Sequence, residues 1–414
     1  MTKKEIMKEI MEPDAPVIFH IDVNSAFLSW SAIRLLKEGS DVDLREIPAI
    51  IGGDESTRHG IVVAKSLKAK AYGIRTADTV ASARSKCPDL VIQPPDHAYY
   101  REQSRQLMEH LYEICPVIQQ VSVDECYMSF EPVRDRFSSP EEAARYIKDS
   151  VRESFGYTVN IGISDRKVLA KMASDFQKPD KVHTLYHYEI RKKLWPLPVE
   201  ELYMCGRSSA AFLKKMGVKT IGDLAVLDRQ MVQTWLKSQG NLLWNYANGI
   251  DDSAVEPEPS KAKGIGNSTT LSNDAQTREE CRKVLRMLTE KVAGRMKKEG
   301  VRASQISVEI KYATFVSVSH QMGIQPAAAA PEILFAKVGM LFDELWSGEP
   351  VRLLGVRVSK LEEENAEVQM NLFDYQKESA RSRKQKDLEE AMEKIRRRYG
   401  AHAVYRGTEE WQKR

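Results

Sequence analysis

The stretch VSVDECYMSF, residues 121–130, decides how the rest of the sequence is interpreted. Its apolar residues predict a buried strand, yet Asp124 and Glu125 stand side by side in the middle of it. Strands are poor in Asp, and a buried carboxylate is costly unless it meets a cation. Asp22 repeats the pattern at the end of another apolar strand, VIFHIDV (17–23). Two predicted strands therefore offer three carboxylates that need a cationic partner.

A divalent metal is one such partner. Mg²⁺ takes oxygen ligands and is usually held by one or two carboxylates together with substrate phosphates. Two such ions about 4 Å apart stabilise the attacking and leaving oxygens of a nucleotidyl transfer. Acids at a turn, or at the surface edge of a sheet, are the alternative that the pattern by itself leaves open.

Size, composition and cysteine usage narrow the class of protein. At 414 residues the chain is too long for one core and predicts two to four domains. Five scattered cysteines without a C-x-x-C pair argue against a disulfide framework and a zinc site, and for a reducing compartment. No run of about 18 apolar residues could span a membrane, and the N-terminus lacks the apolar core of a signal peptide. We expect a cytoplasmic protein without a membrane partner.

Periodicity divides the chain into three parts. Strands alternate with helices up to residue 180, which predicts an α/β or α+β body. Short helices follow over 185–250, and the polar, proline-containing stretch 251–263 is typical of a linker. Beyond it the order is β-α-β-β-α-β. Within 261–312 of this last part, twelve Lys and Arg oppose six Asp and Glu, which fits either a solvated helix face or a nucleic-acid contact.

Three motifs in order along the chain carry a family resemblance: HIDVNSAF (20–27), SVDECYMSF (122–130) and GISDRKVLAKMASDFQKPD (162–180). They resemble the Y-family DNA polymerases, closest to the bacterial DNA polymerase IV group. The resemblance implies an α+β multidomain, right-hand polymerase that adds deoxynucleotides to a primer on a DNA template. It implies a palm (1–34 and 100–184), fingers (35–99), a helical thumb with a helix-hairpin-helix (185–250), the linker 251–263, a little finger (264–360) and a clamp-binding tail (361–414).

The resemblance also assigns roles to the three acids. Family metal ligands fall on Asp22, Asp124 and Glu125, with the backbone carbonyl of Val23 as a further ligand. These residues would hold two Mg²⁺ ions, with Glu125 nearest the primer 3′-hydroxyl. The family position that often carries a second Asp is Asn24 here, and that position is not a family metal ligand.

Nucleotide selection is assigned in the same way. The family's steric gate against a ribose 2′-hydroxyl falls on Phe27, although a helix Phe can equally belong to the core. Ile61 and Val63 fall on the roof over the nascent base pair; their bulk leads us to expect bypass of minor-groove adducts rather than of cross-linked template bases. The triphosphate-binding Lys of the family falls on Lys171.

The fingers depart from the family pattern. Its triphosphate-contacting Tyr and Arg become Leu67 and Lys70, and Lys cannot reproduce the forked contact of Arg. We expect Lys70, with help from Ser66 or Lys65, to contact the nucleotide.

Two further segments point to partners. Residues 204–222 resemble the family's helix-hairpin-helix, which presents backbone amides to DNA phosphate, and a plain helix pair is the alternative. Gln369, Leu372 and Phe373, in QMNLF, match the peptide by which bacterial polymerases bind the sliding clamp.

The resulting hypothesis is a monomeric translesion DNA polymerase of low fidelity without proofreading. An inactive scaffold that binds DNA and the clamp, and a catalytic subunit that needs accessory proteins, remain alternatives.

Overall fold

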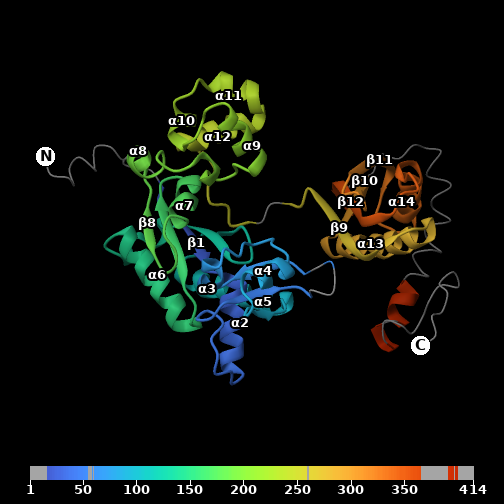
Figure 1. Cartoon of the computed structure of the whole chain (residues 1–414), viewed down its shortest axis with the longest axis horizontal. Coiled ribbons are helices and arrows are strands. Elements are labelled where there is room, and N and C mark those ends of the chain that lie inside the picture. Colours follow the sequence, from blue (N-terminus) through green and yellow to red (C-terminus); the bar gives the residue numbers. More distant parts are fainter. Residues whose placement is uncertain are drawn as a thin grey trace. The chain divides into compact units, whose positions relative to one another are not determined.

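The computed structural model describes residues 16–54, 58, 60–258, 261–364, 390–395 and 397–399. The chain divides into two compact units, Met1–Lys261 and Ala262–Arg414. The α+β fold class implied by the family resemblance is confirmed in both units, since each pairs a β-sheet with helices (Figure 1).

A five-stranded sheet forms the centre of the first unit. Its order is β5-β6-β1-β7-β8, with β1 antiparallel to β6 and to β7, and β7 parallel to β8. The strands are β1 (Ile18–Val23), β5 (Ile118–Gln120), β6 (Glu125–Ser129), β7 (Val159–Ser164) and β8 (Val182–Thr184).

The alternation of β1 gives the sheet two different faces. Phe19, Ile21 and Val23 belong to the core shared with the long helices α2 (Ala26–Lys37), α5 (His97–Ile114) and α6 (Pro140–Phe155). His20 and Asp22 face the other way, where the short helix α7 (Lys167–Ser174) packs on the sheet. Polar side chains of the sheet therefore gather on the α7 face.

The predicted strand at 121–130 is shorter than the sequence indicated. Val121 is 46% exposed, and β6 begins only at Glu125. Ser122 makes the difference, because its hydroxyl accepts the backbone amides of Asp124 and Glu125 and turns the chain before the strand starts. Asp124 thus lies just before the strand and Glu125 is its first residue, so neither acid is in its middle.

A small sheet with short helices forms one end of the first unit (Figure 1). Its order is β3-β2-β4, with β2 antiparallel to β3 and parallel to β4. The elements are β2 (Ala49–Gly52), β3 (Val62–Lys65), α3 (Leu67–Ala71), α4 (Val80–Lys86) and β4 (Val91–Gln93).

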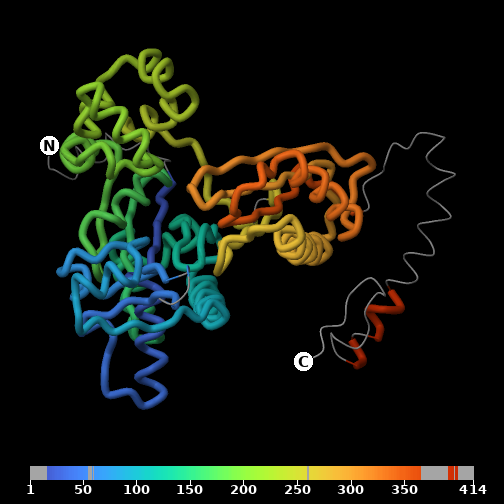
Figure 2. The backbone as a smooth tube through the Cα atoms, turned by 45° about the vertical axis from the view of Figure 1, so that its right-hand side comes forward, coloured from blue at the N-terminus to red at the C-terminus, as the bar shows by residue number. Residues whose placement is uncertain are grey.

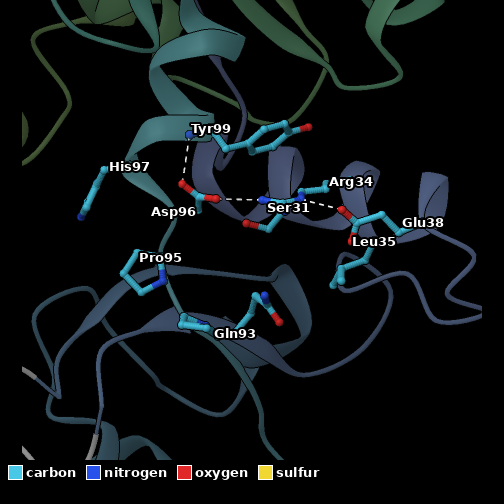
Figure 3. Close-up of a pocket in the computed structure, with 10 residues that line it drawn as sticks. Ser31, Arg34, Leu35, Glu38, Gln93, Pro95, Asp96, His97 and Tyr99 are labelled. Atoms are coloured by element: carbon cyan, nitrogen blue, oxygen red, sulfur yellow. Dashed lines mark hydrogen bonds and ion pairs between the residues drawn. The ribbon is translucent and has the colours of Figure 1, made fainter. Parts of the chain in front are cut away.

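A pocket of about 360 Å³ lies where α2 and α5 meet. Figure 3 shows its centre, in which Arg34 binds both Asp96 and Glu38, at 2.8 Å each. Its charged groups are thus paired with one another at the start of α5.

Short helices occupy the opposite end of the first unit, as predicted for 185–250 (Figure 1). They are α8 (Ile190–Lys193), α9 (Arg207–Lys215), α10 (Ile221–Ala225), α11 (Arg229–Leu236) and α12 (Ser238–Ala247). Gly217 has φ +88° in the turn between α9 and α10, a backbone region that favours glycine. The predicted helical hairpin is therefore present.

The stretch after α12 begins against the first unit. Asp251 accepts the amide of Val168 at the start of α7, and Val255 packs against Ile18 and Tyr127. Lys167 donates to the carbonyl of Ala254. These contacts hold residues 251–255 on the sheet, so only the later part of 251–263 is available as a connection.

The second unit has the predicted β-α-β-β-α-β order. Four antiparallel strands in the order β11-β10-β12-β9 carry two helices on one face (Figure 2). Ile306, Val308 and Val356 fill the space between sheet and helices. The elements are β9 (Gly264–Ala275), α13 (Arg278–Glu299), β10 (Val301–Tyr312), β11 (Ser317–Ala328), α14 (Pro331–Leu345) and β12 (Val351–Glu363). Within the described parts of both units, no helix is long and apolar enough to cross a membrane.

Candidate active site

The three predicted acids meet at the junction of β1 and β6. Asp22 lies directly opposite Glu125 in the antiparallel register, and the amide of Val23 donates to the carbonyl of Asp124 at 3.0 Å. This backbone bond holds the ends of the two strands together. Asp22 and Glu125 face the α7 side, with side chains only 14% and 26% exposed.

Two lysines bind these carboxylates. The ammonium group of Lys171, on α7, lies 2.6 Å from Glu125 Oε2 and 3.7 Å from Asp22 Oδ2. Lys178, in the loop after α7, lies 2.6 Å from Asp22 Oδ2. Asp175 contacts both ammonium groups, at 3.7 Å and 2.9 Å. The site is thus a compact cluster of alternating charges.

Polar groups behind the acids fix their positions. The imidazole of His20 is fully buried, with Nδ1 2.8 Å from Ser174 Oγ and Nε2 3.3 Å from Glu125 Oε2. Asn24 is also buried; its side chain accepts the amide of Asp180 and so anchors the loop that carries Lys178. Asn24 therefore has a structural role in holding this loop.

The acids differ in their electrostatics. The His20 imidazole and then the Lys171 ammonium hold the pKa of Glu125 down at about 2. Burial raises the pKa of Asp124, and the neighbouring charges of Asp22 and Glu125 raise it further, although Ser122 donates a hydrogen bond at 2.6 Å. Burial alone would lower the pKa of Lys171, but its carboxylate partners outweigh burial and raise it. The partners of Glu125 thus stabilise its ionised form, whereas burial and neighbouring negative charges disfavour the ionised form of Asp124.

The donor set of this cluster fits a divalent cation. Across the described residues, no group of three or more His, Cys, Asp or Glu side chains is spaced to hold a metal ion as the side chains stand. The ammonium group of Lys171 lies between Asp22 and Glu125 as a stand-in cation, and that of Lys178 lies between Asp22 and Asp175. Carboxylate oxygens on two rigid strands are the ligands that Mg²⁺ prefers. Asp22, Asp124 and Glu125 could therefore hold such an ion once the lysines move.

Phe27 lies at the start of α2, four residues beyond Val23. Its ring stacks on Tyr100 with centroids 4.4 Å apart and an interplanar angle of 8°. The Tyr100 hydroxyl is fixed in turn by Ser31, at 2.8 Å. Phe27 is only partly buried and packs against the cores on both sides of α2. The structure thus shows the packing role of Phe27, and its role as a gate stays a prediction.

The predicted roof residues lie in the small sheet. Ile61 is 46% exposed, whereas Val62 between it and Val63 is completely buried. Val63 packs against the same small core as Phe27. The structure therefore brings Val63 near the predicted gate and leaves Ile61 open to a ligand.

The predicted nucleotide contacts of the fingers separate into two kinds. The Ser66 hydroxyl donates to the carbonyl of Ile47 and accepts the amides of Ala49 and Ala69. It caps α3 from a buried position, and this geometry disfavours the nucleotide contact predicted for it. Lys70 is exposed. Burial of Lys65 lowers the pKa of that lysine, and the nearby charge of Lys70 lowers it further. Two lysines this close form a positive region that suits an anion.

Three members of the cluster were not predicted from the sequence: His20, Asp175 and Lys178. His20 had a usable signal, because it precedes Asp22 by two residues in one strand and so shares its face. Lys178 had none, since its partner Asp22 is 156 residues away. Asp175 lies four residues from Lys171 and three from Lys178, a spacing at which side chains of a helix can pair. The predicted clamp-binding residues Gln369, Leu372 and Phe373 lie outside the described residues.

Comparisons with known proteins agree on one family. The impB/mucB/samB family matches residues 21–175, and the C-terminal domain of the same family matches residues 262–372. DNA polymerase IV of Clostridium acetobutylicum is 41% identical over 94% of this chain and 97% of its own. DNA polymerase IV 1 of Bacillus subtilis is 34% identical over 94% and 92%. A solved Y-family DNA polymerase chimera, 19% identical, has the same fold with a TM-score of 0.73 over 84% of this chain and 99% of its own.

Proposed function

The chain belongs to the impB/mucB/samB family of Y-family DNA polymerases, and on this premise we propose that Asp22, Asp124 and Glu125 hold its catalytic metal ions. It is a DNA-directed DNA polymerase of the translesion type, which extends a primer on a template and takes deoxynucleoside triphosphates as substrates. The alternative of an inactive scaffold is not supported, because the relatives of this chain are named as polymerases.

One observation carries the proposed catalytic site. Asp22 of β1 and Glu125 of β6 face each other across a strand pair joined by a backbone hydrogen bond, and the Lys171 ammonium group already lies between them. The family depends on divalent metal; we propose two Mg²⁺ ions, with the Val23 carbonyl as an additional ligand. When bound, such ions would neutralise charge on the reacting phosphate oxygens. Glu125, whose pKa of about 2 keeps it ionised, would lie nearest the primer 3′-hydroxyl.

The protein's own groups bind and select the nucleotide. Lys171 and Lys178 supply point charges for phosphate oxygens, as Lys does at phosphate sites. Lys70 adds a third charge from the fingers. Phe27 excludes a ribose 2′-hydroxyl because the Tyr100 ring stacked against it prevents the Phe27 ring from moving away. Ile61 and Val63 cover the nascent base pair, and their bulk favours bypass of minor-groove adducts.

The remaining parts hold DNA and a partner. We propose that the first unit provides palm (1–34 and 100–184), fingers (35–99) and thumb (185–250), and that 264–360 is the little finger. Its uncovered sheet face exposes Arg357 and Lys360, which suits salt-dependent contact with DNA phosphates. The peptide 369–373 would bind a sliding clamp and raise the local enzyme concentration on DNA. Since one chain supplies the whole site, we propose a monomer, and five free thiols fit the cytoplasm.

Primer extension tests the catalytic proposal. Glu125→Gln keeps the shape of the side chain and removes its charge, so the single-turnover rate with Mg²⁺ should fall at least about 100-fold, the effect of roughly 2.7 kcal/mol. Asp43→Asn is the matched control, because Asp43 is an equally shielded acid (23% exposed) that pairs with Arg45 outside the site. A Glu125→Gln enzyme as fast as the control would remove Glu125 from the chemistry.

A further inference from the structure

The lysines of the active site have more than one available partner. Lys171 lies 2.6 Å from Glu125 and 3.7 Å from both Asp22 and Asp175. Lys178 lies 2.6 Å from Asp22 and 2.9 Å from Asp175. Each ammonium group therefore touches a proposed metal ligand and also Asp175, which lies outside the proposed ligand set. Asp175 is 45% exposed and sits at the end of α7, between the two lysines in sequence.

These ion pairs occupy one oxygen of each of two proposed metal ligands. Asp22 Oδ2 accepts from Lys178 at 2.6 Å, and Glu125 Oε2 accepts from Lys171 at 2.6 Å. Mg²⁺ binds carboxylate oxygens at about 2.1 Å. A divalent cation at that distance would repel an ammonium group on the same oxygen, since like charges this close interact strongly away from bulk water. Metal and lysine must therefore compete for Asp22 and Glu125.

A displaced lysine would need another anion. Asp175 is a single carboxylate for two ammonium groups. A nucleoside triphosphate carries several negative charges and has phosphate oxygens that suit the compact charge of Lys. The loop holding Lys178 is anchored by Asn24 through the amide of Asp180, so the side chain can change partner without movement of its backbone support.

We propose that Lys171 and Lys178 are exchangeable counter-ions of the metal carboxylates and that they transfer to the triphosphate when a divalent cation binds. Each ligand then favours the other: the metal releases lysines for the nucleotide, and the nucleotide removes lysines from the metal site. By linkage, the factor by which nucleotide raises metal affinity equals the factor by which metal raises nucleotide affinity. The inference rests on the proposed metal site and adds that lysines oppose metal binding there.

Mn²⁺ binding to the full-length protein, followed by electron paramagnetic resonance without nucleotide or DNA, tests this competition. Lys178→Met removes one competing ammonium group, so Mn²⁺ should bind more tightly, by about fivefold or more. Lys193→Met is the matched control, because Lys193 is 35% exposed against 34% for Lys178 and lies 2.6 Å from its own carboxylate, Glu189. Equal or weaker Mn²⁺ binding by Lys178→Met would overturn the proposal.

Two further arms separate the possible failures. Asp22→Asn should abolish the Mn²⁺ site; if it binds Mn²⁺ as the wild type does, the proposed metal site itself is wrong. With Ca²⁺ present, Lys178→Met should bind a fluorescent dATP analogue less tightly than the wild type does, and unchanged binding would exclude the transfer to phosphate. If circular dichroism shows that Lys178→Met is unfolded, both measurements are repeated with Lys171→Met, which removes the ammonium group next to Glu125.

Discussion

Asp124→Asn should make the protein more stable while it removes activity. The Asp124 carboxylate is partly buried and, within the described residues, has no Lys, Arg or His nitrogen within ion-pair distance. Burial and the charges of Asp22 and Glu125 raise its pKa, so its ionised form is disfavoured in the folded state. Asn is nearly the same size and can keep the hydrogen bond from Ser122.

The size of the gain follows from the burial of a charge that lacks a cation. Leaving such a polar group incompletely satisfied costs about 1–3 kcal/mol, and we take about 1–2 kcal/mol because Ser122 offsets a part. For a unit of this size, that amounts to a rise in Tm of about 3–6 °C. Asp43→Asn should show no gain, because Arg45 lowers the pKa of Asp43 and its ionised form is favoured.

The raised pKa of Asp124 also determines how the stability gain of Asp124→Asn changes with pH. A carboxyl whose folded pKa is raised binds its proton more tightly when folded, so its destabilising effect is absent below the ordinary pKa near 4 and grows as pH rises through the folded pKa. The Tm difference between Asp124→Asn and wild type should therefore be full at pH 7.5 and shrink toward pH 4. Calorimetry without divalent metal measures it. An unchanged or lower Tm at pH 7.5 would refute the reasoning.

Three other changes address the nucleotide and clamp contacts. Phe27→Ala should raise ribonucleotide insertion relative to deoxynucleotide insertion by about 100-fold, because the rigid ring no longer meets the 2′-hydroxyl; unaltered sugar selection in steady-state kinetics would exclude the gate. Lys70→Ala should raise the apparent KM for the nucleotide about tenfold, as expected for loss of a charged hydrogen bond, and an unaltered KM would contradict the contact. Deletion of 369–373 should abolish stimulation by the sliding clamp and spare basal synthesis, so loss of basal synthesis as well would argue against a pure tether.

Much of the fold could be predicted because its signals are local. The strand predicted at 17–23 shows in its run of apolar residues, and the structure has it at Ile18–Val23. The start of β6 could not be predicted in this way. Val121 and Val123 continue the alternation, but the Ser122 side chain competes for backbone amides and turns the chain.

From the residue pattern alone, the site was predictable only as far as its acids, and Lys171 was indicated only by the family resemblance. Asp22 and Glu125 stand out because carboxylates are rare in apolar strands. Lys178 is a lysine in a polar loop, and nothing near it in sequence marks its partner Asp22, 156 residues away. Ser66 lies beside the predicted nucleotide-binding positions in the motif, and what the motif did not indicate is that its hydroxyl caps the start of α3.

The most direct test of the central claim is the position of metal in a crystal of the enzyme with primer, template, a non-hydrolysable deoxynucleotide and Mn²⁺. Anomalous scattering from Mn²⁺ should give a peak between Asp22, Asp124 and Glu125, with the Lys178 ammonium moved away from Asp22 toward the triphosphate. A Mn²⁺ peak elsewhere, with Lys171 and Lys178 still bound to the two carboxylates, would contradict the assignment of these acids as the catalytic metal ligands.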